Sequence, residues 1–267
     1  MKPSNLKDIQ NLKDHRGIAL QKVGVKDVET PLIIQRKNDK EQVVSAKSRF
    51  SVALPQDYKG THMSRFIEIL NEWRQKNLLG VDIDGCLHEV AKRLDAKSAE
   101  LRFEFKYFIE KNSPVSNLSC PMGYDCAFEG TLDVDSNEYQ FILEVNVPVT
   151  TLCPCSKEIS DHGAHNQRAF VKLKVSYDPT QIIWIEDLVA LVESCGSCPV
   201  YPLLKREDEK FVTEFAYNNP KFIEDVIRDV IAELRKIDFI NWFEVECEAH
   251  ESIHNHSAWA YQYEECL

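Results

Sequence analysis

The sequence has no long hydrophobic run. No stretch of its 267 residues approaches the roughly 18 consecutive apolar residues that a membrane-spanning helix requires. The first residues, Met1–Asn5, are polar and show no apolar signal-peptide core. We therefore expect a cytoplasmic protein without a membrane partner.

The chain also lacks the excess of positive charge that a nucleic-acid-binding surface requires. Its 43 acidic residues outnumber its 32 Lys and Arg residues, so the net charge at pH 7 is −11. We therefore expect no nucleic-acid partner, although a local cluster of Lys or Arg can still bind a nucleotide. The apolar content of 43% is ordinary for a globular protein, and the length allows one or two domains.

Nine cysteines in a chain of this length do not indicate a secreted disulfide scaffold. Clustered cysteines in a reducing compartment are more often metal ligands or nucleophiles. The cysteines outside clusters are expected to pack as small apolar groups. These are Cys86, Cys120, Cys126, Cys247 and Cys266.

Hydrophobic periodicity predicts an α+β chain with two similar halves. Alternating residues predict strands at 28–34, 42–54, 101–107, 127–134, 139–149, 171–177, 239–247 and 258–263. Helical spacing predicts helices at 63–73, 84–94, 185–192 and 219–234. The order of strands, two helices and two strands recurs, which favours a duplicated unit with an antiparallel sheet and helices on one face.

The segments between these elements carry two further local predictions. Asn219 is expected to cap the last helix, with Pro220 at its first position. A turn is expected at 37–40, and the polar residues 1–25 are expected to form an arm that orders on contact with a partner.

Three polar loops at strand or helix ends carry most of the candidate chemistry, because a scaffold can direct such loops into one cleft. The loop around 150–168 is the richest in reactive groups. In chain order the three loops hold Cys153, Cys155, His162 and His165; Cys195, Cys198, Glu207 and Glu209; and His250, Glu251, His254 and His256.

These residue types leave several kinds of site open. Cys153, Cys155, Cys195 and Cys198 could form a structural zinc site, although the Cys-Pro-Cys spacing is shorter than the usual Cys-x(2–4)-Cys. Cys195 and Cys198 could instead form a redox pair. A mixed set of thiolate, carboxylate and imidazole suits a catalytic divalent metal better, with a spare His as general acid or base.

Charged residues near the loops also allow two interpretations. Glu224 falls in the first turn of a predicted helix, where the helix dipole alone favours an acid. It could also accept N–H bonds from a heterocycle in a pocket. The cations near the loops form either a solvated face or a clamp for phosphates. They are Lys157, Arg168, Lys205, Arg206 and Lys210.

Several long segments of the chain resemble the GTP cyclohydrolase type IB family. They are Thr151–Ser160, Gly163–Arg168, Leu204–Arg206, Asp208–Glu214 and Glu251–His256, together with Gly60–Arg65 and Asn219–Phe222. The similarity covers nearly the whole chain from about residue 10. It implies the bimodular tunnelling fold, with modules at 26–150 and 151–267 after an arm at 1–25. It also implies a homotetramer with active sites at subunit interfaces.

The same resemblance implies a reaction and a set of site residues. GTP and water would give 7,8-dihydroneopterin triphosphate and formate, the first step of folate-type pterin synthesis. One divalent metal, Zn²⁺, Mn²⁺ or Fe²⁺, would activate the water that attacks C8. Its implied ligands are Cys153, Glu209 and His254, with Glu207, His250 or His256 as alternatives by motif position.

The resemblance also implies roles beyond the metal. His165 would move protons as the imidazole ring of guanine opens, and Glu224 would bind the guanine edge. Oxidation of Cys155 with Cys153 would switch the site off. The triphosphate would be held by Lys205, Arg206 and Arg168.

Two other functions remain possible from the residues. A tunnelling-fold nitrile reductase would use Cys153 or Cys155 as the nucleophile of a thioimide, with NADPH and without a metal. A non-enzymatic protein would use the four clustered cysteines to hold a structural zinc ion.

Overall fold

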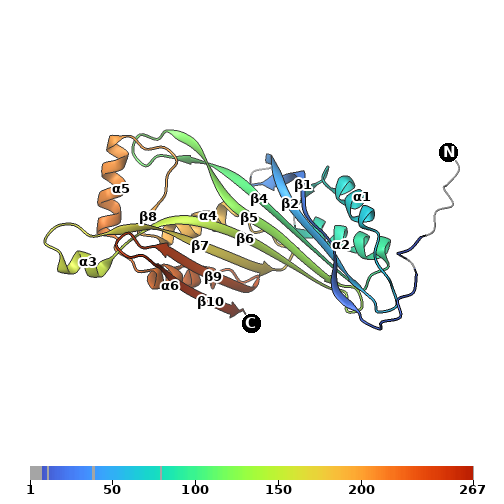
Figure 1. Cartoon of the computed structure of the whole chain (residues 1–267). Coiled ribbons are helices and arrows are strands. Elements are labelled where there is room, and N and C mark those ends of the chain that lie inside the picture. The colour runs from blue at the N-terminus through green and yellow to red at the C-terminus, as the bar shows by residue number, and fades with distance from the viewer. Residues whose placement is uncertain (1–7, 11, 38–39, 79, 267) are drawn as a thin grey trace. The chain divides into compact units, whose positions relative to one another are not determined.

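The computed structural model describes residues 8–10, 12–37, 40–78 and 80–266, which form an α+β fold (Figure 1). The strands are β1 (Leu20–Arg36), β2 (Lys40–Leu54), β3 (Asn77–Leu78), β4 (Ser98–Asn112), β5 (Ser119–Asp133), β6 (Glu138–Leu152), β7 (Asn166–Tyr177), β8 (Cys198–Pro199), β9 (Ile240–His250) and β10 (Ser257–Glu265). The helices are α1 (Met63–Trp73), α2 (Gly80–Leu94), α3 (Pro154–Ile159), α4 (Ile185–Cys195), α5 (Arg206–Asn218) and α6 (Ile223–Leu234). In the part of the chain described, no helix combines the length and apolar character needed to cross a membrane.

The chain divides into two compact units. The first comprises Met1–Gln35, Asp39–Phe105 and Phe128–Phe141, and the second comprises Arg36–Asn38, Lys106–Ala127 and Ile142–Leu267. Strands β4, β5 and β6 each begin in one unit and end in the other. The module boundaries after residues 25 and 150 stay predictions.

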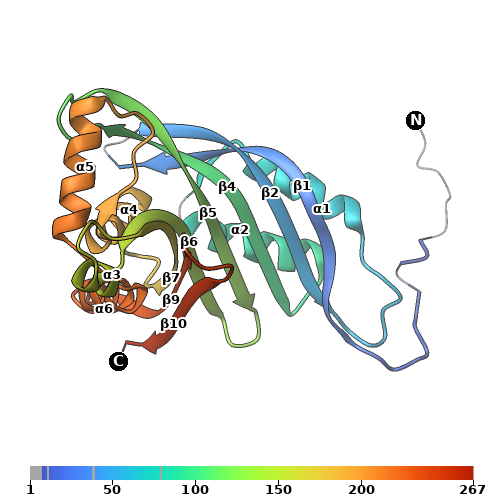
Figure 2. The same cartoon turned by 60° about the vertical axis from the view of Figure 1, so that its left-hand side comes forward.

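In the first unit, α1 and α2 pack together on the apolar face of the sheet (Figure 2). Hydrogen bonds order its strands as β6-β5-β4-β2-β1-β3, and β3 runs parallel to β1. The Phe50 ring on β2 lies 6.3 Å from Phe66 of α1 and 6.1 Å from Phe103 of β4. Gly130 on β5 allows the close approach of α2, because a Cβ there would lie 2.6 Å from Ile83.

In the second unit, the strand order is β4-β5-β6-β7-β9-β10, and the short β8 pairs with β6. Helix α6 packs on β9 and beside α4. Val147, Val171 and Cys247 occupy neighbouring registers on β6, β7 and β9 and are fully buried. This apolar layer positions the strand ends from which the reactive loops emerge.

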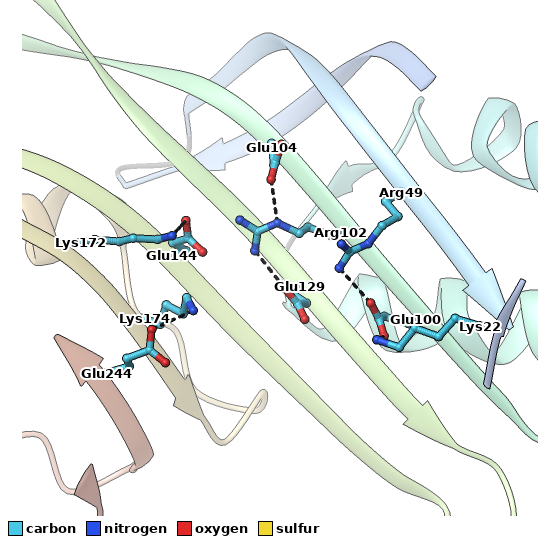
Figure 3. A network of polar contacts seen from close by, with 10 residues as sticks. All are labelled: Lys22, Arg49, Glu100, Arg102, Glu104, Glu129, Glu144, Lys172, Lys174 and Glu244. Atoms are coloured by element: carbon cyan, nitrogen blue, oxygen red, sulfur yellow. Dashed lines mark hydrogen bonds and ion pairs between the residues drawn. The ribbon is translucent and has the colours of Figure 1, made fainter. Parts of the chain in front are cut away.

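The opposite face of the strands is charged and internally paired (Figure 3). In the first unit, Arg102 on β4 donates hydrogen bonds of 2.9 Å to both Glu104 and Glu129. Alternation along the strand places these groups opposite buried Leu101 and Phe103. The other pairs drawn are Lys22 and Arg49 with Glu100 in the first unit, and Lys172 with Glu144 and Lys174 with Glu244 in the second.

The predicted strands and helices are confirmed, but several boundaries differ. Strand β1 begins at Leu20, so residues 20–25 of the expected arm belong to the sheet. Residues 1–7 and 11 of that arm, and residues 38 and 39 of the expected turn, lie outside the described residues. Strand β9 extends to His250, so the beginning of the third predicted loop is strand.

Two predictions around the last helix are wrong. The end of the predicted second loop, which holds Glu207 and Glu209, is instead part of the helix α5, and Asn219 lies at the end of that helix. Helix α6 starts only at Ile223, with Phe222 as its N-cap residue. The backbone N–H of Phe222 donates to the Asp225 carboxylate at 3.0 Å, so Asp225 stabilises the helix start in place of Asn219.

Candidate active site

A cavity of about 270 Å³ in the second unit gathers residues from three separate segments. Cys153 and His165 come from the first loop, Glu224 from the first turn of α6, and His254 and His256 from the turn between β9 and β10. The rest of the lining is Gln167, Lys221, Phe222, Ile223, Glu251 and Ala258. The cavity therefore brings a thiol, three imidazoles and two carboxylates together.

Local backbone geometry fixes Cys153 at the edge of this cavity. The residue is the N-cap of α3, and Pro154 occupies the first helical position, where a missing N–H costs nothing. The Cys153 sulfur accepts the Ser156 backbone N–H at 3.4 Å. The Ser156 hydroxyl donates to the Cys153 carbonyl at 3.1 Å. These two hydrogen bonds close the turn and so fix the direction of the Cys153 side chain.

His165 is tied to the same turn. Its carbonyl accepts the Cys153 N–H at 3.1 Å, and its own N–H donates to the Ser156 hydroxyl at 3.2 Å. The imidazole Nδ1 lies 3.0 Å from Gln167 Oε1 and 4.0 Å from Glu251 Oε2. Only 15% of the His165 side chain is exposed. Cys153 and His165, which are far from α6 in the sequence, thus hold fixed positions relative to each other at one wall of the cavity.

The histidines of the third segment separate into two groups. The His254 and His256 rings stack with centroids 5.0 Å apart, and both residues are exposed at the cavity. His250 instead lies on β9 and packs edge-on against Phe170, with ring centroids 5.6 Å apart. Of the histidines considered as ligands, His254 and His256 therefore line the cavity and His250 does not.

The predicted metal ligands are not all gathered by one chain. Cys153 and His254 line the cavity, whereas Glu209 and Glu207 are exposed on α5 and do not line it. Within the described residues, no group of three or more His, Cys, Asp or Glu is arranged to hold a metal ion. The Cys153 thiol and the His254 imidazole at the cavity are of kinds that bind divalent metals.

In the described part of the chain, the four clustered cysteines are not arranged to hold a zinc ion. Cys195 and Cys198 are buried free thiols, and burial raises the pKa of Cys198 to about 11. Cys198 packs in a small core with Leu152 of β6 and Ala216 of α5. These contacts give Cys198 a structural role, since its side chain joins the inner face of α5 to the strand that ends beside Cys153.

The comparison with known sequences identifies the family. The profile described as type I GTP cyclohydrolase folE2 matches residues 6–260. This chain belongs to the FolE2 family. The "GTP cyclohydrolase FolE2" of Geotalea uraniireducens (strain Rf4) is 51% identical over 255 residues, which cover 96% of this chain and 92% of that protein. The FolE2 protein of Geobacter sulfurreducens is 51% identical over 253 residues, covering 95% and 96% of the two chains.

Solved structures agree on the fold of this FolE2 chain. The uricase of Arthrobacter globiformis matches with a TM-score of 0.57 and 6% identity, covering 92% of this chain and 93% of that one. A uricase from Bacillus fastidious matches with a TM-score of 0.53 and 8% identity, covering 92% and 94%. At such low identity the likeness concerns the fold alone, and it confirms the predicted α+β tunnelling fold.

Some predicted site residues of the FolE2 chain lie outside the cavity lining. Cys155, Arg168, Lys205 and Arg206 are exposed and do not line it. The structure also adds lining residues to which no role was assigned from the sequence. These are Gln167, Lys221 and Glu251, each of which falls inside a segment that resembles the family. For Gln167 and Lys221, membership of such a segment was the signal in the sequence that could have found them, and Glu251 was also among the candidate groups of the third loop.

Lys221 does not act as an unpaired cation at the cavity. Its ammonium group donates to the Asp229 carboxylate at 2.7 Å and to the Cys195 carbonyl at 2.9 Å. Its backbone N–H donates to the Leu152 carbonyl at 3.0 Å. Lys221 therefore joins the start of α6 to the strand end beside Cys153, and so keeps two walls of the cavity together.

Proposed function

We propose that this FolE2 chain converts GTP and water to 7,8-dihydroneopterin triphosphate and formate at the cavity of its second unit. The observation that carries the proposal is the meeting of Cys153, His165 and Glu224 in one cavity, although they come from separate segments. The relatives named GTP cyclohydrolase FolE2 span nearly the same length and support the same activity.

The protein side chains would bind the base and move protons. The carboxylate of Glu224 offers only hydrogen-bond acceptors, which match the N–H groups on the edge of guanine. His165 would exchange protons with the opening imidazole ring, because an imidazole changes protonation near neutral pH. Arg168, Lys205 and Arg206 are exposed beyond the cavity lining, and we assign them to the triphosphate.

We propose Cys153, His254 and Glu209 as the residues that hold one divalent metal, with His256 as the alternative imidazole. Zn²⁺, Mn²⁺ or Fe²⁺ in this place would supply Lewis-acid activation of the attacking water. Because Glu209 does not line the cavity of its own chain, we assign this ligand to a second copy. We retain Cys155 as the residue whose oxidation with Cys153 would switch the site off, since its thiol is exposed.

Exposed apolar side chains support the proposal that a second copy of the chain packs beside the cavity. Phe222 lines the cavity and is 40% exposed, and Ile253 in the neighbouring turn is 63% exposed. On α5, the exposed rings of Phe211 and Phe215 stack with centroids 5.6 Å apart. Clustered exposed apolar groups of this kind mark protein interfaces. We propose a homotetramer with interfacial active sites, acting in the cytoplasm.

Formate release from GTP tests this function. Protein stripped with a chelator is assayed with Zn²⁺, Mn²⁺ and Fe²⁺ added separately, and Cys153→Ala is then assayed in the best metal. We expect metal-dependent formate that disappears in the variant. The matched control is Cys120→Ala, which removes a partly exposed thiol outside the cavity and should retain activity. Folded protein that releases no formate with any of these metals would contradict the proposal.

A further inference from the structure

A hydrogen-bonded chain of three residues runs from the buried C-terminal end of strand β6 to the imidazole of His165. We propose that Gln167 is a positioning residue that holds His165 in one tautomer, and that Thr151 anchors Gln167 for this purpose. The proposal rests on the proton-transfer role of His165 proposed above. The test of the tautomer needs no turnover, so the positioning role of Gln167 and the proton-transfer role of His165 can fail separately.

Strand register builds this chain. Gln167 on β7 lies directly opposite Thr151 on β6. The Gln167 side-chain amide donates from Nε2 to Thr151 Oγ1 at 3.1 Å and presents Oε1 to His165 Nδ1 at 3.0 Å. Thr151 is fully buried, so its hydroxyl offers a fixed partner that water does not displace. The amide is therefore held at both ends.

The orientation of the amide determines the tautomer of the imidazole. A carboxamide oxygen only accepts hydrogen bonds, so Nδ1 of His165 must carry the proton when Gln167 Oε1 faces it. The carboxylate of Glu251 lies 4.0 Å from the same nitrogen and is a second acceptor. An unprotonated Nδ1 would point its lone pair at both acceptors, which is unfavourable. The structure thus leaves Nε2 as the unprotonated nitrogen of the neutral ring, available to take a proton.

The reversed amide is the competing arrangement. The Thr151 hydroxyl would then donate to the amide oxygen, and the amide nitrogen would donate to a lone pair on Nδ1. That arrangement places the Nδ1 lone pair against the Glu251 carboxylate, which is unfavourable at 4.0 Å with only 13% of the Glu251 side chain exposed. Glu251 and Gln167 therefore favour the same tautomer.

Three variants test the positioning role by steady-state kinetics of the metal-loaded enzyme. Gln167→Met keeps the length but removes the acceptor, and we expect kcat to fall roughly 10- to 100-fold with KM for GTP little changed. Gln167→Glu keeps an acceptor for the Nδ1 proton, so it should recover much of that loss. Thr151→Val removes the anchor while keeping the shape, and should lower kcat less than Gln167→Met.

The second measurement reads the tautomer directly in chelator-stripped protein. Nitrogen-15 spectra of the histidine rings, with His165 identified by its loss in His165→Asn, should show Nδ1 protonated in the wild type. In Gln167→Met the signal should shift toward the Nε2-protonated form. Thermal melts establish whether each variant is folded. If Gln167→Met does not fold, the tautomer is read in Thr151→Val and Gln167→Glu instead.

Three results would overturn the proposal. A wild-type ring protonated on Nε2 would show that the amide is reversed. An unchanged tautomer in folded Gln167→Met and Thr151→Val would show that neither residue sets it. A rise in KM for GTP at constant kcat in Gln167→Met would show that Gln167 binds substrate instead of positioning His165.

Discussion

At the scale of single residues, Ser156 links Cys153 to His165. Its hydroxyl donates to the carbonyl of Cys153 and accepts the backbone N–H of His165, so one side chain connects both candidate catalytic residues. A proline at the start of α3 limits the backbone further. The relative position of thiol and imidazole is therefore set before any ligand binds.

Ser156→Ala removes both hydrogen bonds without adding bulk. We expect the free energy of unfolding to fall by about 1–2 kcal/mol and kcat to fall, because the Cys153–His165 geometry loosens. Urea unfolding and formate release measure the two effects. Ser160→Ala is the matched control, since its hydroxyl contacts only the exposed His162 backbone. Equal effects of the two variants on kcat would contradict a role of Ser156 at the site.

Glu224→Gln tests recognition of the base. The change replaces one acceptor oxygen by an amide donor that opposes the guanine N–H groups, so KM for GTP should rise roughly 10- to 100-fold. Glu233→Gln, on the last turn of the same helix, should leave KM unchanged. A kcat loss without a KM change in Glu224→Gln would instead place Glu224 in the chemical step.

At the scale of elements, a buried carboxylate fixes α5 to the β4–β5 loop. Asp208 is fully buried and accepts hydrogen bonds from the backbone N–H groups of Val115, Ser116 and Lys205 and from the Ser116 hydroxyl. Burial by itself raises the pKa of Asp208. The hydrogen bonds, led by those from Ser116, outweigh it and hold the pKa well below its usual range.

This lowered pKa predicts a pH dependence of stability. A carboxylate whose pKa is depressed by folding stabilises the fold above its unfolded pKa of about 3.9 and loses that effect as the pH falls below it. Wild-type Tm should therefore drop as the pH decreases below about 4. Asp208→Asn should lower Tm at pH 7 and reduce the slope at acid pH, as measured by thermal melts. The exposed Glu214→Gln on the same helix should do neither. An unchanged Tm in Asp208→Asn at pH 7 would contradict this assignment.

Helix α5 also shows why some elements escaped prediction. Its buried positions are Asp208 and Ala216, with Val212 partly buried between them, whereas the larger apolar residues Phe211 and Phe215 are exposed. The long alternating runs of β4 and β6, in contrast, predicted both strands, because each buries one face under helices. Periodicity reports burial of apolar groups, and the buried start of α5 is a carboxylate.

The candidate site was predictable only in part for a related reason. Cys153, His165 and His254 fall in segments with family-like sequence, Glu224 follows such a segment by two residues, and the fold brings all four to one cavity. The contribution of Gln167 depends on its register opposite Thr151, which composition does not reveal. The proposed role of Glu209 concerns the association of chains, which a single sequence does not specify.

At the scale of the whole molecule, the proposed ligand set of Cys153, His254 and Glu209 predicts that more than one copy forms each site. One chain brings Cys153 and His254 to the cavity and carries Glu209 exposed on α5. In a closed homo-oligomer, the same surfaces meet at every interface, so each chain can supply Glu209 to a neighbour and receive one in return.

Hybrid oligomers test at once whether the cavity is the active site and whether Glu209 of a neighbouring chain completes it. Cys153→Ala and Glu209→Ala chains are co-expressed with different tags, and oligomers that carry both tags are assayed for formate release from GTP. Each variant alone should be inactive. The hybrids should regain about a quarter of the wild-type rate per site, because random pairing leaves that fraction of sites with both ligands intact. Hybrids no more active than either variant would show that one chain supplies both ligands, and full activity of Glu209→Ala alone would remove Glu209 from the site.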